Sequence, residues 1–242
     1  MRLRRETAAP VADPTRGVEL RAVGHVYGDR LVLADIDLHL TERRIGIVGA
    51  NGSGKSTFAR LLNGLVVPTT GSVLVDGLDT RAHVREVRRR VGFVFQDPDA
   101  QIVYPTVAED VAYGLENQGV PAAERAERVA EVLERYGLAG HADHPAHLLS
   151  GGQKQLLAIA GVLVMRPARI VFDEPTTLLD LVNTRRVAQL VEDLEQQVVV
   201  VTHDLDLLHG FDRVLVIDDG RVVTDGPPDS SVSAYRALMV HR

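Results

Sequence analysis

The chain has 242 residues, which is enough for one α/β domain with an inserted helical part. Its net charge of −6 argues against nucleic acid as a main partner, because proteins that neutralise a phosphate backbone are usually basic. The absence of cysteine excludes disulfides, zinc–thiolate sites and cysteine nucleophiles together. No apolar run approaches the roughly 20 residues of a membrane-spanning helix, so we expect any membrane role to depend on a partner.

The part before residue 97 has the character of strands around one glycine-rich turn. Residues 1–16, rich in arginine, alanine and proline, are predicted to form a flexible tail that is not a secretory signal. Five segments then alternate apolar and polar residues or are short apolar runs, as strands do: 18–26, 31–40, 45–48, 72–75 and 91–95. Helical spacing over residues 57–65 predicts a helix directly after the turn.

Residues 97–165 change to mostly helical character. Thr106 and Glu109 have the spacing of a capping box, which predicts the start of one helix. A second helix is predicted over residues 121–137, where proline suits the start and glycine the end. A third is predicted over residues 150–165, with a serine as its N-cap.

The rest of the chain returns to alternating strands and helices. Predicted strands are 170–172, 198–202, 214–217 and 221–224, and predicted helices are 179–196 and a short one from about residue 231. Strands that alternate with helices predict an α/β fold with a largely parallel sheet. The leading hairpin adds an N-terminal antiparallel portion, and the middle of the chain adds an inserted helical subdomain.

Residues 49–56 (Gly-Ala-Asn-Gly-Ser-Gly-Lys-Ser) match the spacing of a phosphate-binding loop between a strand and a helix. Glycines let backbone N–H groups turn around a phosphate, and the following helix presents its positive end. We expect Lys55 to reach the β- and γ-phosphates of a nucleotide and the Ser56 hydroxyl to bind Mg²⁺. A glycine-rich turn that binds nothing is the competing interpretation.

Residues 169–174 (Arg-Ile-Val-Phe-Asp-Glu) form an apolar strand that ends in two carboxylates. Asp173 is placed to hold Mg²⁺, and Glu174 to orient or deprotonate an attacking water. Such a strand end is commonplace by itself. Its position after a phosphate loop favours the catalytic interpretation.

Residues 149–153 (Leu-Ser-Gly-Gly-Gln) place Ser150 as an N-cap before two glycines at a helix start, a second anion-binding end in one chain. A glycine loop between helices is the alternative. With the phosphate loop and the two carboxylates, this segment resembles the ATP-binding cassette family, over residues 17–226. The resemblance implies a Mg²⁺-dependent ATPase in which Ser150, Gly151, Gly152 and Gln153 contact the ATP of the opposite subunit.

Three further positions match family motifs one by one. Gln96 matches the glutamine that touches Mg²⁺ and the water, Asp180 the aspartate that communicates across the dimer, and His203 the histidine on the γ-phosphate. By itself, a histidine at a strand end is more often structural. The implied catalytic residues are Glu174, His203 and Gln96, and the implied metal ligands are Ser56, Gln96 and Asp173.

Tyr27 is the only aromatic residue before the phosphate loop, and we expect it to stack on adenine, with a core tyrosine as the alternative. The predicted ATP-binding residues are Tyr27, Gly49, Asn51, Gly52, Ser53, Gly54, Lys55, Ser56 and Thr57. Lysine occurs only at Lys55 and Lys154, so a lysine kept in the loop fits a site that needs a compact ammonium. The expected domains are a tail (1–16), an ATP-binding core in two parts (17–96 and 166–242) and a helical signature subdomain (97–165).

Two departures from the common cassette pattern indicate which subfamily of cassette proteins the chain resembles. Residues 176–180 read Thr-Thr-Leu-Leu-Asp, and Leu156 stands where arginine is frequent. With residues 95–102 (Phe-Gln-Asp-Pro-Asp-Ala-Gln-Ile), these features resemble the energy-coupling-factor importers, most of all the biotin branch and next the cobalt/nickel branch. The resemblance implies a homodimer, or a heterodimer with a related ATPase. It also implies a transmembrane coupling protein, a small membrane substrate-binding protein and a peripheral position on the cytoplasmic face of the membrane.

Two other functions are alternatives to an importer subunit. A non-transport cassette ATPase of translation or DNA repair usually has two cassettes, a basic surface or long insertions, which this chain lacks. A module that binds ATP without hydrolysis is disfavoured by the presence of Glu174 and His203. For the membrane partner, we expect Asp99, helped by Glu109 or Asp110, to bind its arginines. A solvated charged face is the alternative there.

Overall fold

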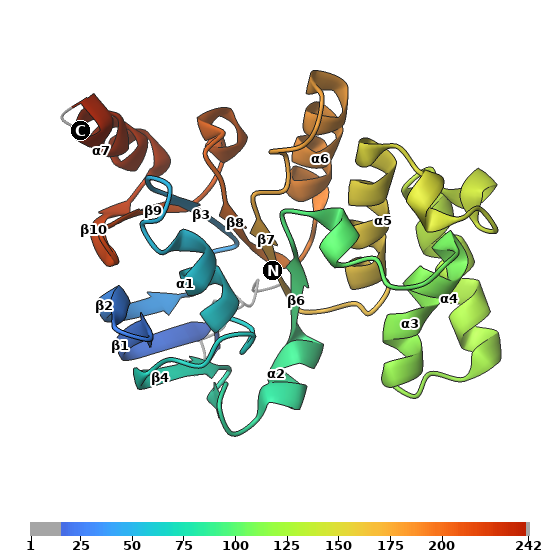
Figure 1. Cartoon of the computed structure of the whole chain (residues 1–242), viewed down its shortest axis with the longest axis horizontal. Coiled ribbons are helices and arrows are strands. Elements are labelled where there is room, and N and C mark those ends of the chain that lie inside the picture. The colour runs from blue at the N-terminus through green and yellow to red at the C-terminus, as the bar shows by residue number, and fades with distance from the viewer. Residues whose placement is uncertain (1–15, 241–242) are drawn as a thin grey trace, which may run out of the picture.

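The computed structural model of the chain describes residues 16–240, so the predicted flexible tail lies, apart from residue 16, outside the described residues. The strands are β1 (Val18–Tyr27), β2 (Arg30–Leu40), β3 (Arg44–Val48), β4 (Thr70–Val75), β5 (Leu78–Asp79), β6 (Val91–Val94), β7 (Arg169–Asp173), β8 (Gln197–Val201), β9 (Arg213–Asp218) and β10 (Arg221–Gly226) (Figure 1). The helices are α1 (Lys55–Leu61), α2 (Val84–Arg90), α3 (Val107–Asn117), α4 (Ala122–Arg135), α5 (Gly151–Leu163), α6 (Leu181–Asp193) and α7 (Pro228–Val240). Short 3₁₀ turns are η1 (Pro98–Ala100), η2 (Ala139–His141), η3 (Ala146–Leu148) and η4 (Leu205–Leu208). Over residues 16–240, no helix has both the length and the apolar character to cross a membrane.

The strands form two sheets. The first has the order β2-β1-β4-β5 and is antiparallel, which confirms the predicted N-terminal antiparallel portion. The second has the order β10-β9-β3-β8-β7-β6 and is parallel except for the edge pair of β9 and β10, which is the predicted hairpin. Because parallel strands end at the same edge, the residues that follow β3, β6, β7 and β8 meet there.

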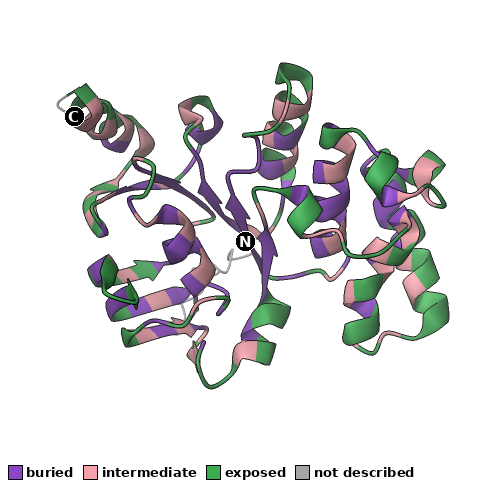
Figure 2. Cartoon of the chain, viewed as in Figure 1, coloured by how far each residue is buried: buried purple, intermediate pink, exposed green. Residues whose placement is uncertain are grey.

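The two faces of the parallel sheet carry different layers. Successive side chains of a strand point to opposite faces. On one face, Val171 packs in a cluster with Phe58 of α1. On the other, Ile170 and Phe172 pack in a cluster with Leu157 of α5. Helices α1 and α5 therefore lie on opposite faces of the sheet, and Figure 2 shows the strands between them as buried.

The helical part of the middle region confirms the predicted caps. Thr106 and Glu109 form a complete capping box at the start of α3, and Pro121 directly precedes α4. Ser150 and Gln153 form a second complete capping box at the start of α5. Most residues of α5 are buried, because it packs against both the sheet and the neighbouring helices.

Several element limits differ from the prediction. Helix α1 begins at Lys55, two residues before the predicted start, because Gly54 already turns the chain into it. Helix α2 and the two-residue strand β5 were not predicted. Only Val87 of α2 is buried and its last turn holds three arginines, so it has no amphipathic repeat to detect. The last helix starts at Pro228, earlier than expected.

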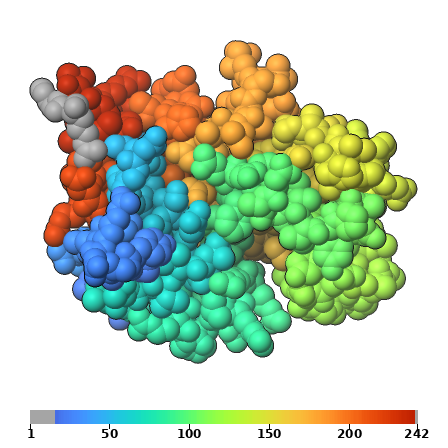
Figure 3. All heavy atoms as spheres, in the orientation of Figure 1, coloured from blue at the N-terminus to red at the C-terminus, as the bar shows by residue number. Residues whose placement is uncertain are grey.

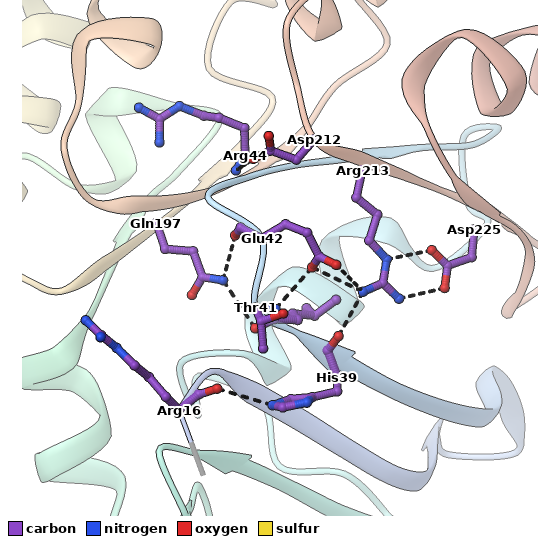
Figure 4. Close-up of polar contacts among 10 residues, drawn as sticks. Arg16, His39, Thr41, Glu42, Arg44, Gln197, Asp212, Arg213 and Asp225 are labelled. Carbon is purple, nitrogen blue, oxygen red and sulfur yellow. Dashed lines mark hydrogen bonds and ion pairs between the residues drawn. The ribbon is translucent and has the colours of Figure 1, made fainter. Parts of the chain in front are cut away.

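A polar junction joins the two sheets at the edge opposite to the carboxyl ends of the strands (Figure 4). Arg213 of β9 pairs with Asp225 of β10 (2.6 Å) and with Glu42 in the connection between β2 and β3 (3.1 Å). Its guanidinium also donates to the carbonyl of His39 in β2 (2.8 Å). Gln197, at the start of β8, donates to the carbonyl of Glu42 (2.8 Å). These bonds fix the antiparallel sheet to the parallel one.

Candidate functional site

A pocket of about 770 Å³ opens at the carboxyl ends of the parallel strands, which is in the range of small-molecule sites. It is lined by Tyr27, Arg30, Val32, Gly49, Ala50, Asn51, Gly52, Gly54, Lys55, Ser56, Thr57, Gln96, Glu174, Thr177, His203, Tyr235 and Met239. The fold thus brings together the residues predicted to bind ATP and those predicted to act on it. Two predicted residues lie just behind the wall: Ser53 and Asp173 are buried and do not line the pocket.

The phosphate-binding loop follows β3 and depends on glycine conformations. Gly52 and Gly54 have φ angles of 78° and 105°, which residues with a Cβ rarely adopt. A Cβ on Gly54 would also lie 2.8 Å from the carbonyl oxygen of Val32. Gly54 is the N-cap of α1 and supplies no side-chain cap. The first N–H groups of α1 are therefore left for a ligand.

Lys55 is held inside this loop. Its ammonium donates to the carbonyl oxygens of Gly49 (2.8 Å) and Ala50 (2.9 Å), and the residue is buried. Burial lowers the pKa of Lys55, while the charges of Glu174 and Asp173 act in the opposite direction. A buried ammonium that only carbonyl groups satisfy is suited to receive an anion.

Ser56 and Asp173 supply two hard oxygen ligands side by side. The Ser56 hydroxyl donates to Oδ1 of Asp173 (2.9 Å), at the end of β7. Burial raises the pKa of the Asp173 carboxyl, and the Ser56 hydrogen bond and the nearby Arg60 oppose the shift. Within residues 16–240, no group of three or more His, Asp or Glu side chains forms a metal cage. One hydroxyl and one carboxylate next to a phosphate loop are the ligands that Mg²⁺ commonly uses, so the residues fit this ion.

Glu174 and His203 meet across the ends of β7 and β8. Nδ1 of His203 lies 2.6 Å from Oε2 of Glu174, and the Thr177 hydroxyl donates to the same oxygen (3.2 Å). Glu174 has a φ of 54°, which strains a residue with a Cβ, and its side chain is almost fully buried. Backbone strain of this kind persists where the surrounding structure fixes a side chain in place.

Gln96 and Tyr27 lie on the rim. Gln96 comes two residues after β6 and reaches the pocket from the end of that strand. Tyr27, at the end of β1, is 49% exposed and its ring meets the His25 ring edge-on at 4.5 Å between centroids. This exposure disfavours the interpretation of Tyr27 as a core residue.

The signature segment lies elsewhere. None of residues 150–153 lines the pocket in the described part of the chain, and Ser150 is exposed. A Cβ on Gly152 would lie 2.3 Å from the side chain of Asn183, so a larger residue there must displace that side chain. Asp180 accepts a hydrogen bond from the Asn183 N–H (2.8 Å) and is the N-cap of α6. Within one chain, Asp180 therefore fixes the helix that packs on the signature.

Six pocket residues were not among the predicted site residues: Arg30, Val32, Ala50, Thr177, Tyr235 and Met239. Arg30 follows the hairpin turn after Tyr27. Its closeness in sequence to this predicted site residue is the signal that could have indicated it as a pocket residue. Tyr235 comes from α7, and its hydroxyl lies 3.4 Å from the carbonyl oxygen of Gly49. Burial raises the pKa of Tyr235, and the charge of Glu174 adds to the rise.

The three predicted docking carboxylates all have partners inside the chain. Asp99 pairs with Lys154, directly after the signature (2.7 Å). Glu109 accepts from the Thr106 hydroxyl in the capping box (2.6 Å). Asp110 accepts from the backbone N–H groups of residues 103 and 104 (2.8 and 3.0 Å), and burial raises the pKa of its carboxyl.

Asp110 also lines a groove of about 580 Å³ between α2, α3 and α5. In Figure 3 this region is the notch that separates α2 from the lobe formed by α3 and α4. Its walls combine arginines of α2 with apolar and aromatic side chains: Arg85, Arg88, Arg89, Phe93, Phe95, Val103, Tyr113, Val162 and Met165. Val103 is 64% exposed and Tyr113 is 41% exposed. Such exposure of large apolar groups is typical of a surface that another protein covers.

The sequence is similar to known proteins over nearly its whole length. Residues 33–177 match the family model described as ABC transporter. A putative ABC transporter ATP-binding protein of Deinococcus radiodurans is 61% identical, over 92% of this chain and 98% of its own. A biotin transport ATP-binding protein of Rhizobium etli is 44% identical, over 91% and 98%. An energy-coupling factor transporter ATP-binding protein of Symbiobacterium thermophilum is 52% identical, over 82% and 72%.

Two solved structures share the fold. The cbiO1 protein of Clostridium perfringens, described as part of the ABC transporter complex cbiONQ, has a TM-score of 0.79 at 33% identity and covers 93% of this chain and 94% of its own. The ATP-binding cassette MJ0796, a dimer in a post-hydrolysis state with ADP and Pi, has a TM-score of 0.77 at 32% identity and covers 87% and 98%. These likenesses confirm the predicted α/β fold, with its phosphate-loop core.

Proposed function

This chain belongs to the ABC transporter family, whose ATP-binding proteins are ATPases, and we propose that it powers import through a separate transmembrane partner. Relatives named for biotin transport and for energy-coupling factor transport support an importer of the energy-coupling-factor type. Biotin is the favoured cargo, followed by cobalt or nickel and by other vitamins. The proposal includes a coupling protein and a small substrate-binding protein in the membrane, with this chain bound peripherally at the cytoplasmic face.

One observation carries the mechanism that we propose. The pocket holds the phosphate loop, Gln96, Glu174 and His203, but the signature segment lies at the start of α5, on the other face of the sheet from α1. A chain therefore lacks the signature at its own ATP site. We propose that two chains pair so that the signature of each covers the ATP of the other. The dimeric cassette structure with bound ADP and Pi supports this arrangement. Two identical chains are the simpler form, and a related ATPase as partner is the other.

The residues of the pocket divide the chemistry between them. Lys55 would leave the loop carbonyls and bind the β- and γ-phosphates, while Tyr27 stacks on the adenine. Ser56, Asp173 and Gln96 would hold Mg²⁺, which would supply positive charge beside the phosphates. Glu174, fixed by His203, would orient the attacking water and take its proton while the bond from the γ-phosphate to ADP breaks. The products are ADP and phosphate.

A mixed dimer tests the crossed arrangement. One chain carries Lys55→Ala and the other Ser150→Arg, each with a different affinity tag for isolation of the mixed species. If the signature acts across the interface, one site collects both lesions and the other stays intact. About half of the wild-type ATP turnover is then expected, or less if the two sites are coupled.

A second arm uses Glu174→Gln, which should bind ATP and trap a dimer on a sizing column.

Coupling between the two ATP sites could inactivate the mixed dimer even when the arrangement is crossed. The second experiment separates that case from an arrangement that is not crossed. In the Glu174→Gln background, adding Ser150→Arg should abolish the trapped dimer, because the ATP loses its contact with the second chain. A dead mixed dimer together with a Glu174→Gln, Ser150→Arg chain that still dimerises on ATP would overturn the crossed arrangement. A Glu174→Gln chain that stays monomeric at saturating ATP would refute the dimer itself.

We further propose that the groove beside α3 receives the membrane partner. Asp99 is exposed in η1, two residues before Gln101 of the groove wall, and its pair with Lys154 lies at the surface, where ion pairs are weak and exchangeable. An arginine of the partner would displace Lys154 and bind the Asp99 carboxylate with two hydrogen bonds. Glu109 or Asp110 would add negative charge beside it.

The test compares Asp99→Arg with Lys154→Gln. Both changes remove the internal ion pair, but only the first removes the docking carboxylate. Asp99→Arg should abolish uptake in cells while the isolated chain keeps its basal ATP turnover, and Lys154→Gln should keep both. If uptake survives Asp99→Arg, the docking role of Asp99 is wrong. If basal turnover is lost as well, Asp99 belongs to the catalytic machinery.

A further inference from the structure

The signature glutamine has a hydrogen-bond partner that its own motif does not contain. The side-chain amide of Gln153 lies between the start of α5 and the ring of His141, at the end of η2. Its Oε1 accepts from the backbone N–H of Ser150 (2.9 Å), and its Nε2 lies 3.0 Å from Nε2 of His141. The Ser150 hydroxyl in turn accepts from the Gln153 N–H (3.3 Å). These three residues form one chain of hydrogen bonds.

The chemistry of these groups fixes the direction of every bond. The Ser150 N–H is a backbone donor, so the amide atom that faces it must be the oxygen. The amide nitrogen, which is a donor, then faces His141. The ring nitrogen that it meets must therefore be an acceptor, and the ring proton must be on Nδ1. His141 is a neutral imidazole in this arrangement.

The opposite side of the ring has no such partner. Nδ1 of His141 is buried and, over the described residues, has no hydrogen-bond partner. An unpaired buried N–H is unfavourable, and such groups are few in folded proteins. A leucine would fill the same space without this donor. The ring is therefore suited to its contact with Gln153 and poorly suited to plain packing.

We propose that His141 is a positioning residue of the signature segment and acts through the amide of Gln153 on Ser150. The acceptor nitrogen of His141 holds the amide so that its oxygen keeps facing the Ser150 N–H. This keeps the capping box closed and the Ser150 side chain at the helix start. Without the acceptor the amide is free to turn, and the N-cap loses its reciprocal bond. The inference rests on the proposed role of Ser150 at the ATP of the second subunit.

Substitutions at His141 separate the acceptor from the volume of the ring. His141→Gln places an oxygen acceptor near the position of Nε2, whereas His141→Leu keeps the volume and loses the acceptor. We expect ATP turnover of the dimer to fall about tenfold in the leucine variant and to stay within about twofold of wild type in the glutamine variant. ATP binding to the monomer, which uses its own phosphate loop, should be unchanged in both. His147→Leu, an exposed neighbour on the same segment, is the matched control and should behave as wild type.

A role in simple packing predicts a different pattern. Packing alone would make leucine harmless and glutamine harmful, and that outcome overturns the inference. Loss of ATP binding by the monomer overturns it too, because the effect would then not be at the signature. The imidazole ¹⁵N chemical shifts of the unmodified chain give a test that needs no substitution. A proton on Nδ1 of His141 is expected, and a proton on Nε2 contradicts the assignment.

A mixed dimer shows at which ATP site the lesion acts. One chain carries His141→Leu and the other Lys55→Ala, beside the Ser150→Arg mixed dimer described above. The His141 lesion should fall on the partner's site, already disabled, so turnover should equal that of a dimer with one Lys55→Ala chain. If the Ser150→Arg dimer keeps its intact site and the His141→Leu dimer loses a further tenfold, the inference fails. If the Ser150→Arg dimer itself fails, the crossed arrangement is wrong, and the comparison of leucine with glutamine still decides the role of His141.

Discussion

The starts of α1 and α5 carry the two glycine-rich motifs of the chain, yet they are built in opposite ways. Helix α1 begins after Gly54, which has a φ of 105° and gives no side-chain cap. Helix α5 begins after Ser150, which closes a complete capping box with Gln153. The first end leaves its N–H groups to a ligand, whereas the second satisfies part of them with its own side chains.

The surroundings of the two helix starts also differ, in burial and in charge. The first is surrounded by charge that is already out of water: Lys55, Asp173 and Glu174 are 7%, 2% and 8% exposed. The second presents an exposed Ser150. Buried charges hold a site ready for a charged ligand, and an exposed capped end needs another surface to exclude water. This difference supports the proposal that one end works within its own chain and the other against a second chain.

The largest expected effect comes from the charge at α1. Lys55→Ala should reduce ATP turnover by on the order of 100-fold or more, the scale of losing one donor to transition-state charge. Lys55→Arg should be nearly as damaging, because the planar guanidinium does not fit where the ammonium lies 2.8 and 2.9 Å from two loop carbonyls. Turnover and ATP binding of the purified variants measure both. Full ATP binding by Lys55→Arg would show that the loop is less closely fitted than its geometry indicates.

The residues around the start of α1 could be predicted from the sequence because the loops that hold them follow predicted strands. Gln96, Glu174 and His203 come within two residues of the ends of β6, β7 and β8, and the parallel order of these strands brings their ends to one edge. The spacing of a motif relates only residues that are near in sequence. The parallel sheet then brings several such motifs close together in space. The predicted strands of the sheet, the capping box at Thr106 and the N-cap at Ser150 were confirmed because they too rest on local patterns.

Several of the residues that sequence reasoning missed reach their sites from distant parts of the chain. Tyr235 and Met239 enter the pocket from α7, and no local spacing relates them to the phosphate loop. The bond between His141 and Gln153 depends on the path of the loop between two 3₁₀ turns. Asn183 is unremarkable in sequence, and only packing shows why Gly152 has no side chain. Contacts made across elements decide these positions, and a local pattern does not contain them.

The two glycines at α5 allow a sharper test of the second end. A Cβ on Gly152 would lie 2.3 Å from the Asn183 side chain, but on Gly151 the nearest atom is the carbonyl oxygen of Leu178 at 4.0 Å. Neither glycine has a positive φ, so alanine suits both backbones. Gly152→Ala should destabilise the isolated chain by about 1–3 kcal/mol through overpacking. Gly151→Ala should leave stability within about 0.5 kcal/mol, the usual range at a position with free space.

Urea unfolding of the isolated chains measures these differences. Adding Asn183→Ala to Gly152→Ala removes the obstructing side chain and should restore most of the lost stability. Turnover of the dimer then separates folding from function: Gly151→Ala has room within its own chain, so any loss of turnover must arise at the second subunit. Equal destabilisation by the two alanines would contradict the packing on which this comparison depends.

The smallest expected effect is on the stability of the chain and comes from Asp173, a buried carboxylate near the start of α1. It is compared with Asp76, which binds the opposite end of β7. At the amino end, Arg169 holds Asp76 with two hydrogen bonds (2.9 and 2.5 Å), and Asp173 lies at the carboxyl end. Burial raises the pKa of the Asp173 carboxyl. Burial also acts to raise the pKa of Asp76, but the bonds from Arg169 and the Gly17 N–H outweigh it, and that pKa is lowered.

These opposite shifts predict opposite dependences of stability on pH. A carboxyl with a raised folded pKa holds its proton more tightly when folded, so its contribution to stability falls as pH rises and stays unfavourable above the folded pKa. Asp173→Asn should therefore raise the unfolding midpoint of the nucleotide-free chain at neutral pH by roughly 2–4 °C, the shift that about 1 kcal/mol gives at this size. The gain should shrink as pH falls through the folded pKa and vanish below about pH 3, where aspartate is protonated in both states. Asp76→Asn is the matched control: its carboxylate stabilises the chain above the unfolded pKa, so its loss should lower the midpoint at neutral pH and matter least in acid. Thermal unfolding across pH without nucleotide or Mg²⁺ measures both variants. A lower midpoint for Asp173→Asn at neutral pH would mean that Ser56 and Arg60 already compensate the buried charge at the α1 end.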